Sequence, residues 1–210
     1  MSAEATATTE EAPLSETTAA DTPREPNIWL VAVRDLAIVL AMLTLWAAAD
    51  TWYAVTGFGL AATVSVLNGI LAGGAISGLL HEWGHFIGAR MSGGTAPLAP
   101  ARGFLPLFNF DFEKSEVSHF QAMSVGGNIP TWGFALLLAW ALPLDAPGRI
   151  AIVSAAVGFA IFASVVEFPV ISRVSGGMPP AESLGKISSE TLKTGAISGA
   201  VAALLLAAVL

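Results

Sequence analysis

The sequence predicts an all-α membrane protein with about five transmembrane helices. The chain has 210 residues, of which 54% are hydrophobic and only 12% are charged. A typical soluble domain has about 25% charged residues. The mean hydropathy is +0.70. Several apolar runs also reach the length of about 20 residues that a helix needs to cross a bilayer. We therefore expect lipid to surround most of the chain.

The first 27 residues differ from the rest of the chain. They hold six acidic residues and one basic residue, and they are rich in Ala, Thr, Glu and Pro. No basic stretch precedes an apolar one, as a secretory signal would require. This composition predicts a disordered acidic tail over 1–27, followed by one polytopic membrane domain over 28–210. Because the tail carries most of the net charge of −7, no basic patch suited to nucleic acid is left.

Five apolar segments follow the tail, and each is expected to form a membrane helix. They lie at about 28–49, 55–91, 120–142, 149–171 and 194–210. The second is longer than one crossing needs, and a break near Asn68-Gly69 or Gly73-Gly74 would divide it. Residues 103–113 are aromatic and partly alternating, which predicts a short β-hairpin or a membrane-associated loop.

The basic residues predict the orientation of the chain. With five crossings, one side of the membrane carries Arg24, Arg90, Arg102, Lys114, Arg173, Lys186 and Lys193, and the other carries only Arg149. This bias favours a single crossing for 55–91. It also predicts a multi-pass protein of the cell (inner) membrane with a cytosolic N-terminus. Near the start of the first segment, Arg34 and Asp35 are expected to pair with each other or to extend to the interface.

The pentad His81-Glu82-Trp83-Gly84-His85 lies inside the second apolar segment. Histidines four residues apart share one face of a helix, so the two imidazoles can bind one metal ion. Glu82 lies beside them as a candidate general base toward a water that the metal activates. With three histidines and eleven glutamates in the chain, chance gives this pentad with a probability of about 0.002. The alternative is a pair of histidines satisfied by hydrogen bonds inside the bundle.

Zinc is the metal that the pattern favours, and its third ligand must come from elsewhere in the chain. The chain has no cysteine, so imidazole and carboxylate groups must bind the ion. The candidates are Glu167, His119, Asp111 and Glu182. Glu167 is favoured because it and His85 lie about 8–9 Å from the same end of their helices, at about 1.5 Å per residue. The alternatives for Glu167 are an ion pair with Arg173 and a role in capping a polar pocket.

These features resemble the site-2 protease family of intramembrane zinc metallopeptidases. The pentad followed by Phe86 carries most of the resemblance. Residues 124–128, Ser-Val-Gly-Gly-Asn, resemble a small-residue element of that family, and residues 168–177 resemble the region that supplies its third ligand. In that region Ser175 stands where the family has an aspartate, so Glu167 is the expected substitute. The resemblance implies a membrane-embedded zinc, Glu82 as base, and cleavage of transmembrane substrates near the cytosolic face.

The sequence thus predicts a zinc endopeptidase in which His81, His85 and Glu167 bind Zn²⁺ and Glu82 is catalytic. Its partners would be the lipid bilayer and a transmembrane protein substrate that is locally unwound, because a helical backbone hides its carbonyl groups. Asn128 is a further candidate for stabilising the oxyanion. Two alternatives stay open. One is a catalytically inactive adaptor of the same fold, suggested by Ser175. The other is a metal-transport protein that uses the pentad as a relay.

Overall fold

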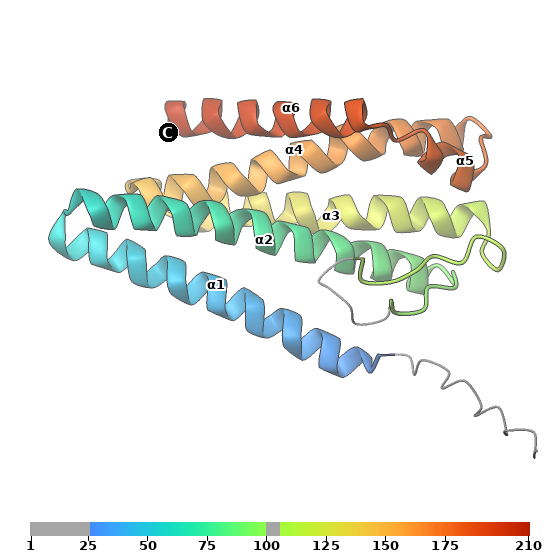
Figure 1. Cartoon of the computed structure of the whole chain (residues 1–210), viewed down its shortest axis with the longest axis horizontal. Coiled ribbons are helices and arrows are strands. Elements are labelled where there is room, and N and C mark those ends of the chain that lie inside the picture. The colour runs from blue at the N-terminus through green and yellow to red at the C-terminus, as the bar shows by residue number, and fades with distance from the viewer. Residues whose placement is uncertain (1–25, 100–105) are drawn as a thin grey trace, which may run out of the picture.

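Helices dominate the computed structural model, which describes residues 26–99 and 106–210. The described helices are α1 (Ile28–Thr56), α2 (Gly59–Met91), α3 (Val117–Ala141), α4 (Pro147–Ser175), α5 (Pro180–Gly185) and α6 (Ser189–Val209). The five long helices alternate in direction along the chain (Figure 1). The described residues contain no strand, so the predicted all-α class is confirmed. Residues 1–25 of the expected tail, which include Arg24, and Arg102 lie outside the described residues.

Four helices are long and apolar enough to cross a membrane, namely α1, α2, α4 and α6. Helix α3 has 25 residues, but its first half contains Ser118, His119, Gln121 and Asn128, which lower its hydropathy. Large apolar side chains are exposed along the bundle; Leu40 of α1 is 55% exposed and Leu204 of α6 is 70% exposed. Apolar groups that face outward in this way suit a lipid environment. The chain is therefore described as a membrane protein.

Local sequence signals fix where the helices begin and end. The side chain of Asn27 accepts a hydrogen bond from the backbone N–H of Trp29 at 2.9 Å and so caps α1. Gly57 ends α1 with a φ of 65°, a left-handed conformation that glycine adopts without strain. Pro147 opens α4 at a position where a helix needs no N–H group. Ser188 caps α6 through the N–H of Thr191.

Helix α2 is continuous through both sites at which a break was considered, Asn68-Gly69 and Gly73-Gly74. The glycines serve close packing instead. A Cβ atom on Gly69 would lie 2.6 Å from the carbonyl oxygen of Gly148, and one on Gly73 would lie 2.5 Å from that of Ile152. Small residues at such crossings let two membrane helices approach closely. Residues 59–91 thus form one unbroken helix that is long and apolar enough for the single crossing expected of 55–91, whereas Val55 and Thr56 belong to α1.

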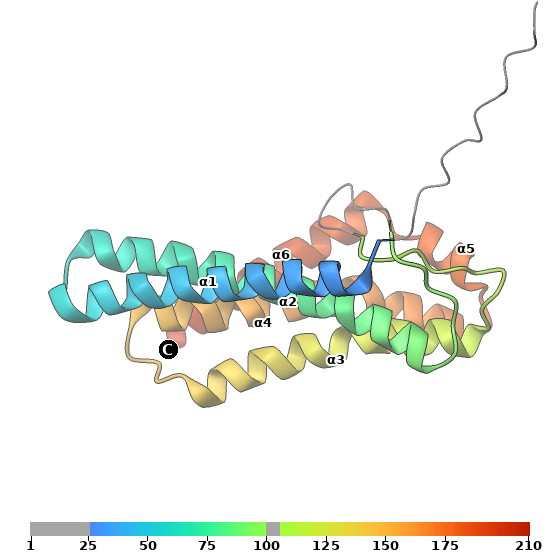
Figure 2. The same cartoon turned by 90° about the horizontal axis from the view of Figure 1, so that it is seen from below.

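Helices α2 and α4 form the centre of the bundle. Helix α2 packs against α1, α3 and α4, and α6 packs against α4. Seen from below, α3 runs along one edge, the first half of α2 along the other, and α4 lies between them (Figure 2). Many buried side chains of α4 are small, including Ala156 and Ala160, which have no exposed surface. This centre holds the C-terminal halves of α2 and α4 side by side.

The segment between α2 and α3 is paired but forms no regular hairpin within its described residues. Leu98 and Phe108 make one isolated antiparallel bridge. Three backbone hydrogen bonds surround it: from Ala99 to Leu107, from Asn109 to Pro97 and from Asp111 to Thr95. Residues 103–105 of the expected hairpin lie outside the described residues. Over 106–113 the expected strand is absent, and a packed loop takes its place.

The two ends of the bundle differ in charge. One end holds the start of α1, the α2–α3 segment and α5 (Figure 1), and with them Arg90, Lys114, Arg173, Lys186 and Lys193. We call it the basic end. At the other end, Arg149 donates to the buried carboxylate of Asp50 at 2.8 Å and to Asp145 at 2.7 Å. Arg34 and Asp35 pair at 2.8 Å as one of the two expectations had it.

Candidate metal centre

Three side chains from α2 and α4 converge near the basic end of the bundle. His81 and His85 lie one turn apart on α2, and their Nε2 atoms are 3.0 Å apart. One oxygen of Glu167 on α4 lies 2.8 Å from Nε2 of His81 and 2.9 Å from Nε2 of His85. His81 is buried, and the other two side chains are mostly buried. The structure thus brings together the three residues that the sequence selects as metal ligands.

The hydrogen bond of His85 assigns the position of its proton. Its Nδ1 atom lies 2.8 Å from the backbone oxygen of Met123. A carbonyl oxygen only accepts hydrogen bonds, so Nδ1 carries the hydrogen and donates it. In the neutral ring, Nε2 is then the unprotonated atom, and its lone pair points toward Glu167.

His81 has the same tautomer by a related argument. Its Nδ1 atom lies 3.2 Å from the hydroxyl oxygen of Thr131. That hydroxyl donates its own hydrogen to the backbone oxygen of Gly127 at 2.7 Å, so toward His81 it acts as an acceptor. Two imidazole lone pairs and a carboxylate oxygen therefore face one point. These groups repel one another unless a proton or a metal cation lies between them.

The donor set fits a zinc ion. Zinc takes imidazole nitrogen and carboxylate oxygen at about 2.0–2.2 Å, mostly in tetrahedral geometry, which corresponds to donors about 3.3 Å apart. The three donor atoms here are 2.8 to 3.0 Å apart, so small side-chain adjustments suffice. The Nδ1–H groups of the two histidines, which face away from this point, donate to Thr131 and Met123. This is the usual arrangement of histidines that bind a metal.

Glu167 is oriented by a chain of polar groups on α3 and α4. The amide group of Asn128 donates to the second oxygen of Glu167, which leaves the first oxygen facing the histidines. The carbonyl oxygen of Asn128 in turn accepts from the hydroxyl of Ser164 at 3.3 Å, and that hydroxyl accepts from the indole of Trp132 at 3.0 Å. Asn128 thus holds the third candidate ligand, a contact different from the oxyanion role considered for it.

Glycines of α2 and α3 make room for the histidines. A Cβ atom on Gly127 would collide with the imidazole ring of His85. Gly84, inside the pentad, lies against the backbone of Gly126, and Gly88 lies against that of Ala122. These contacts bring α3 close enough for its backbone to accept the hydrogen bond from His85. The glycines in 124–128 and in the pentad are therefore explained by helix packing around the site.

Glu82 lies beside the cluster and has a different partner. One of its carboxylate oxygens accepts a hydrogen bond from the backbone N–H of Leu107 at 3.2 Å. Leu107 belongs to the α2–α3 segment and is itself 5% exposed. The segment therefore covers the helix face that carries Glu82 and fixes the carboxylate. Glu82 is not among the three groups whose donor atoms converge.

The other candidate ligands lie apart from the cluster. His119 and Glu116 form a capping box at the start of α3. Glu182 pairs with Lys186 on α5 at 3.1 Å. Asp111 accepts from the backbone N–H groups of Lys114 and Glu113. The N–H of Lys114 contributes most to holding the pKa of Asp111 below its ordinary value.

The alternative partner of Glu167 is also settled. Arg173 donates to Ser183, with Nε 3.1 Å from the side-chain oxygen and Nη2 3.1 Å from the backbone oxygen. The expectation of a Glu167–Arg173 pair is therefore wrong. Ser175, which stands at the family's aspartate position, is the last residue of α4 and accepts from Gln121 at 3.3 Å. It lies eight residues beyond Glu167.

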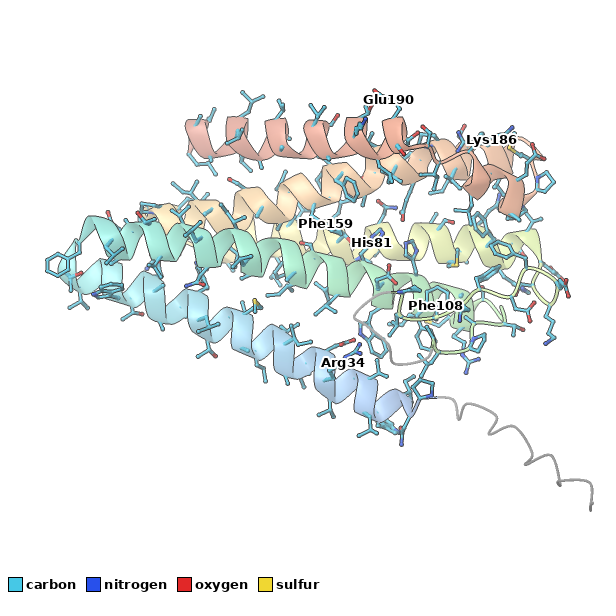
Figure 3. The ribbon with its side chains drawn as sticks, in the orientation of Figure 1. Arg34, His81, Phe108, Phe159, Lys186 and Glu190 are labelled. Carbon is cyan, nitrogen blue, oxygen red and sulfur yellow. The ribbon has the colours of Figure 1, made fainter. Side chains whose placement is uncertain are left out.

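Sequence reasoning missed the groups that hold the ligands, above all Thr131, Ser164 and Trp132. A signal for part of this set was present. Ser124, Asn128 and Thr131 are spaced i, i+4 and i+7, so they form a polar stripe on one face of an otherwise apolar helix. Such a stripe faces the interior of a membrane bundle. On the other flank, the ring of Phe159 meets that of His81 edge to face at 5.8 Å, between α2 and α4 (Figure 3).

Comparisons of the chain with protein-family models, curated proteins and solved structures find no match.

Proposed function

We propose that the chain is an intramembrane zinc metalloendopeptidase that hydrolyses peptide bonds of membrane-spanning proteins. One observation carries the proposal. Two imidazoles whose Nδ1 atoms contact Thr131 and Met123 turn their Nε2 atoms toward one carboxylate oxygen of Glu167, at 2.8 and 2.9 Å, inside an apolar bundle. Ionisable groups at such a place are costly and usually serve function. The resemblance of the pentad to the site-2 protease family points the same way.

The residues have separate tasks in this proposal. His81, His85 and Glu167 would hold the metal, and Asn128 keeps Glu167 turned toward it. A bound zinc ion supplies a water of lowered pKa and polarises the substrate carbonyl. Glu82 is the general base, and it later passes the proton to the leaving amine. The N–H of Leu107 limits the directions in which the Glu82 carboxylate can turn.

The position of the site along the bundle suggests where the cut falls. His85 lies six residues before the end of α2, or about 9 Å at 1.5 Å per residue. That end of the bundle carries most of the lysine and arginine residues. By the positive-inside rule it is the cytosolic end, with the N-terminus on the same side. We therefore propose cleavage near the cytosolic face of the cell (inner) membrane.

The two alternatives are weaker in the light of this geometry. The adaptor was suggested by the serine at the family's aspartate position, but Glu167 offers a carboxylate oxygen to both histidines. A transport protein would need further charged groups along a path through the membrane. In the residues described here, His81, His85 and Glu167 are the group of three that could hold a metal ion.

The test combines zinc content with cleavage. The protein is purified in detergent, its zinc per chain is measured, and cleavage of a transmembrane reporter is compared for wild type and Glu82→Gln. We expect one zinc per chain in both, and cleavage by wild type alone. Glu167→Ala should lose the zinc, whereas Glu190→Ala, an exposed change on α6, should keep it. Zinc bound without cleavage of a panel of reporters would favour the adaptor.

A further inference from the structure

A small cavity adjoins the metal centre on the side of α5. It has a volume of about 120 Å³ and is bordered by His85 and Glu167. Its remaining walls come from three elements and are mostly apolar: Met123 and Ser124 of α3, Val166 and Val170 of α4, Leu184 of α5, and Ile187 from the link to α6. Two candidate metal ligands, His85 and Glu167, thus form one wall of a cavity that the metal ion itself would not fill.

The inner walls of the cavity are fixed. Met123 and Val166 are each 9% exposed and Val170 is 3% exposed. Met123 and Val170 belong to the hydrophobic cluster at this end of the bundle. Side chains in such a cluster rest in close-packed positions, so the cavity keeps its shape without an occupant.

The outer wall is held in place by Arg173. Its guanidinium group donates to both oxygens of Ser183, and the hydroxyl of Ser183 donates to the backbone oxygen of Val170 at 3.2 Å. Ser183 has no exposed surface. These bonds tie the short α5 to the end of α4, so that Leu184 stays over the cavity. Lys186, labelled in Figure 3, marks the outer end of this segment.

We infer that this cavity is a specificity pocket that receives one aliphatic side chain of the substrate, from a residue next to the bond that is cut. The inference rests on the proposed peptidase function. Apart from the wall that His85 and Glu167 form, the lining is mostly apolar and favours an apolar side chain over a charged one. A cavity of about 150 Å³ accepts a benzene ring. This cavity is smaller, at about 120 Å³, so it favours an aliphatic side chain such as that of leucine or valine.

The first experiment measures cleavage preference. Reporters carry Gly, Ala, Val, Leu or Phe at each position that flanks the cut, and mass spectrometry locates the cut. For wild type we expect kcat/KM for the Leu or Val reporter to exceed that for the Gly reporter by at least about tenfold. A methylene group bound in a hydrophobic pocket has an effect of this size. Leu184→Ala should shift the optimum toward Phe, and Leu184→Phe toward Ala. Leu192→Ala, an exposed change on α6, is the control. One shared order of preference in all four proteins overturns the inference.

The second experiment does not depend on cleavage. Because the chain has no cysteine, Ile187→Cys in the full-length protein provides a single thiol in the cavity wall. Its rate of maleimide labelling is measured with a saturating apolar peptide that contains leucine at the flanking position, and with the matched glycine peptide. We expect the leucine peptide to slow labelling more. Protection without any cleavage would refute the peptidase and keep the pocket. Cleavage with equal labelling rates would refute the pocket and keep the peptidase.

Discussion

At the scale of single residues, the two nitrogens of each histidine ring have different partners. The Nδ1 atoms donate to Met123 and Thr131, and the Nε2 atoms face Glu167. Asn128 completes this arrangement from the carboxylate side. The ligands are therefore oriented before any ion arrives, which reduces the conformational entropy lost when it binds.

Asn128 offers the most direct test of this orientation. The change Asn128→Ala removes the donor to Glu167 and leaves all three candidate ligands in place. We expect the affinity for zinc to fall about 10- to 100-fold, the usual effect of losing a partner of a metal ligand. Competition with a chromophoric chelator measures it.

The matched control for Asn128 is Gln121→Ala on the same helix, whose side chain donates to Ser175 and not to the cluster. Equal affinities in wild type and Asn128→Ala would show that Glu167 needs no such support.

The sequence was sufficient to select His81, His85 and Glu167, for physical reasons. The histidine spacing matches one helical turn, and the depth of Glu167 follows from its distance to the end of its segment. The contacts of Asn128 and Glu82 could not be predicted from the sequence. They depend on how α3 is rotated against α4 and on where Leu107 lies, and neither follows from hydropathy.

At the scale of helices, glycine positions decide how closely α2, α3 and α4 approach. Hydropathy alone left open whether Gly69 and Gly73 interrupt α2. The structure shows both at contacts with α4 that leave no room for a side chain. Of the two forms expected near 103–113, the described part shows a loop and no strand, and the rings of Phe110 and Phe112 pack against Phe120 of α3. A short apolar run carries this ambiguity.

Two glycines of α3 provide a matched pair for a test of helix packing. Gly127→Ala places a methyl group where the ring of His85 lies, whereas Gly133→Ala meets no atom within 4 Å. We expect Gly127→Ala to lower both the zinc content and the thermal unfolding temperature in detergent. Gly133→Ala should keep the zinc and leave the protein as stable or more stable, by up to about 1 kcal/mol, because alanine favours the helix. Equal behaviour of the two variants would contradict the packing described for His85.

At the scale of the whole molecule, the distribution of charge matches the alternating helices. Most of the described lysine and arginine residues lie toward one end, whereas Arg149 lies at the other in an ion pair with Asp50. Within the described part of the chain the structure supports four candidate spans, whereas the sequence suggested about five. The difference is α3, whose polar stripe serves the site and lowers the hydropathy of the helix.

The orientation in the membrane can be measured directly because the chain has no cysteine. Glu113→Cys places a thiol at the basic end and Pro143→Cys places one at the opposite end, both at exposed positions. A membrane-impermeant maleimide added to intact cells should label Pro143→Cys and leave Glu113→Cys unlabelled until the membrane is opened. The reverse pattern would place the proposed cleavage on the outer face.

The contact between Asp35 and Trp83 has a mechanical consequence. The carboxylate of Asp35 is 4% exposed and accepts from the indole in the middle of the pentad at 2.9 Å. If α1 moved away here, the Asp35–Arg34 pair would lose the indole donor and face lipid, where ionisable groups are costly. We therefore expect α1 to act as a rigid strut beside the site. Spin labels on α1 and α2 at this level should report a single narrow distance.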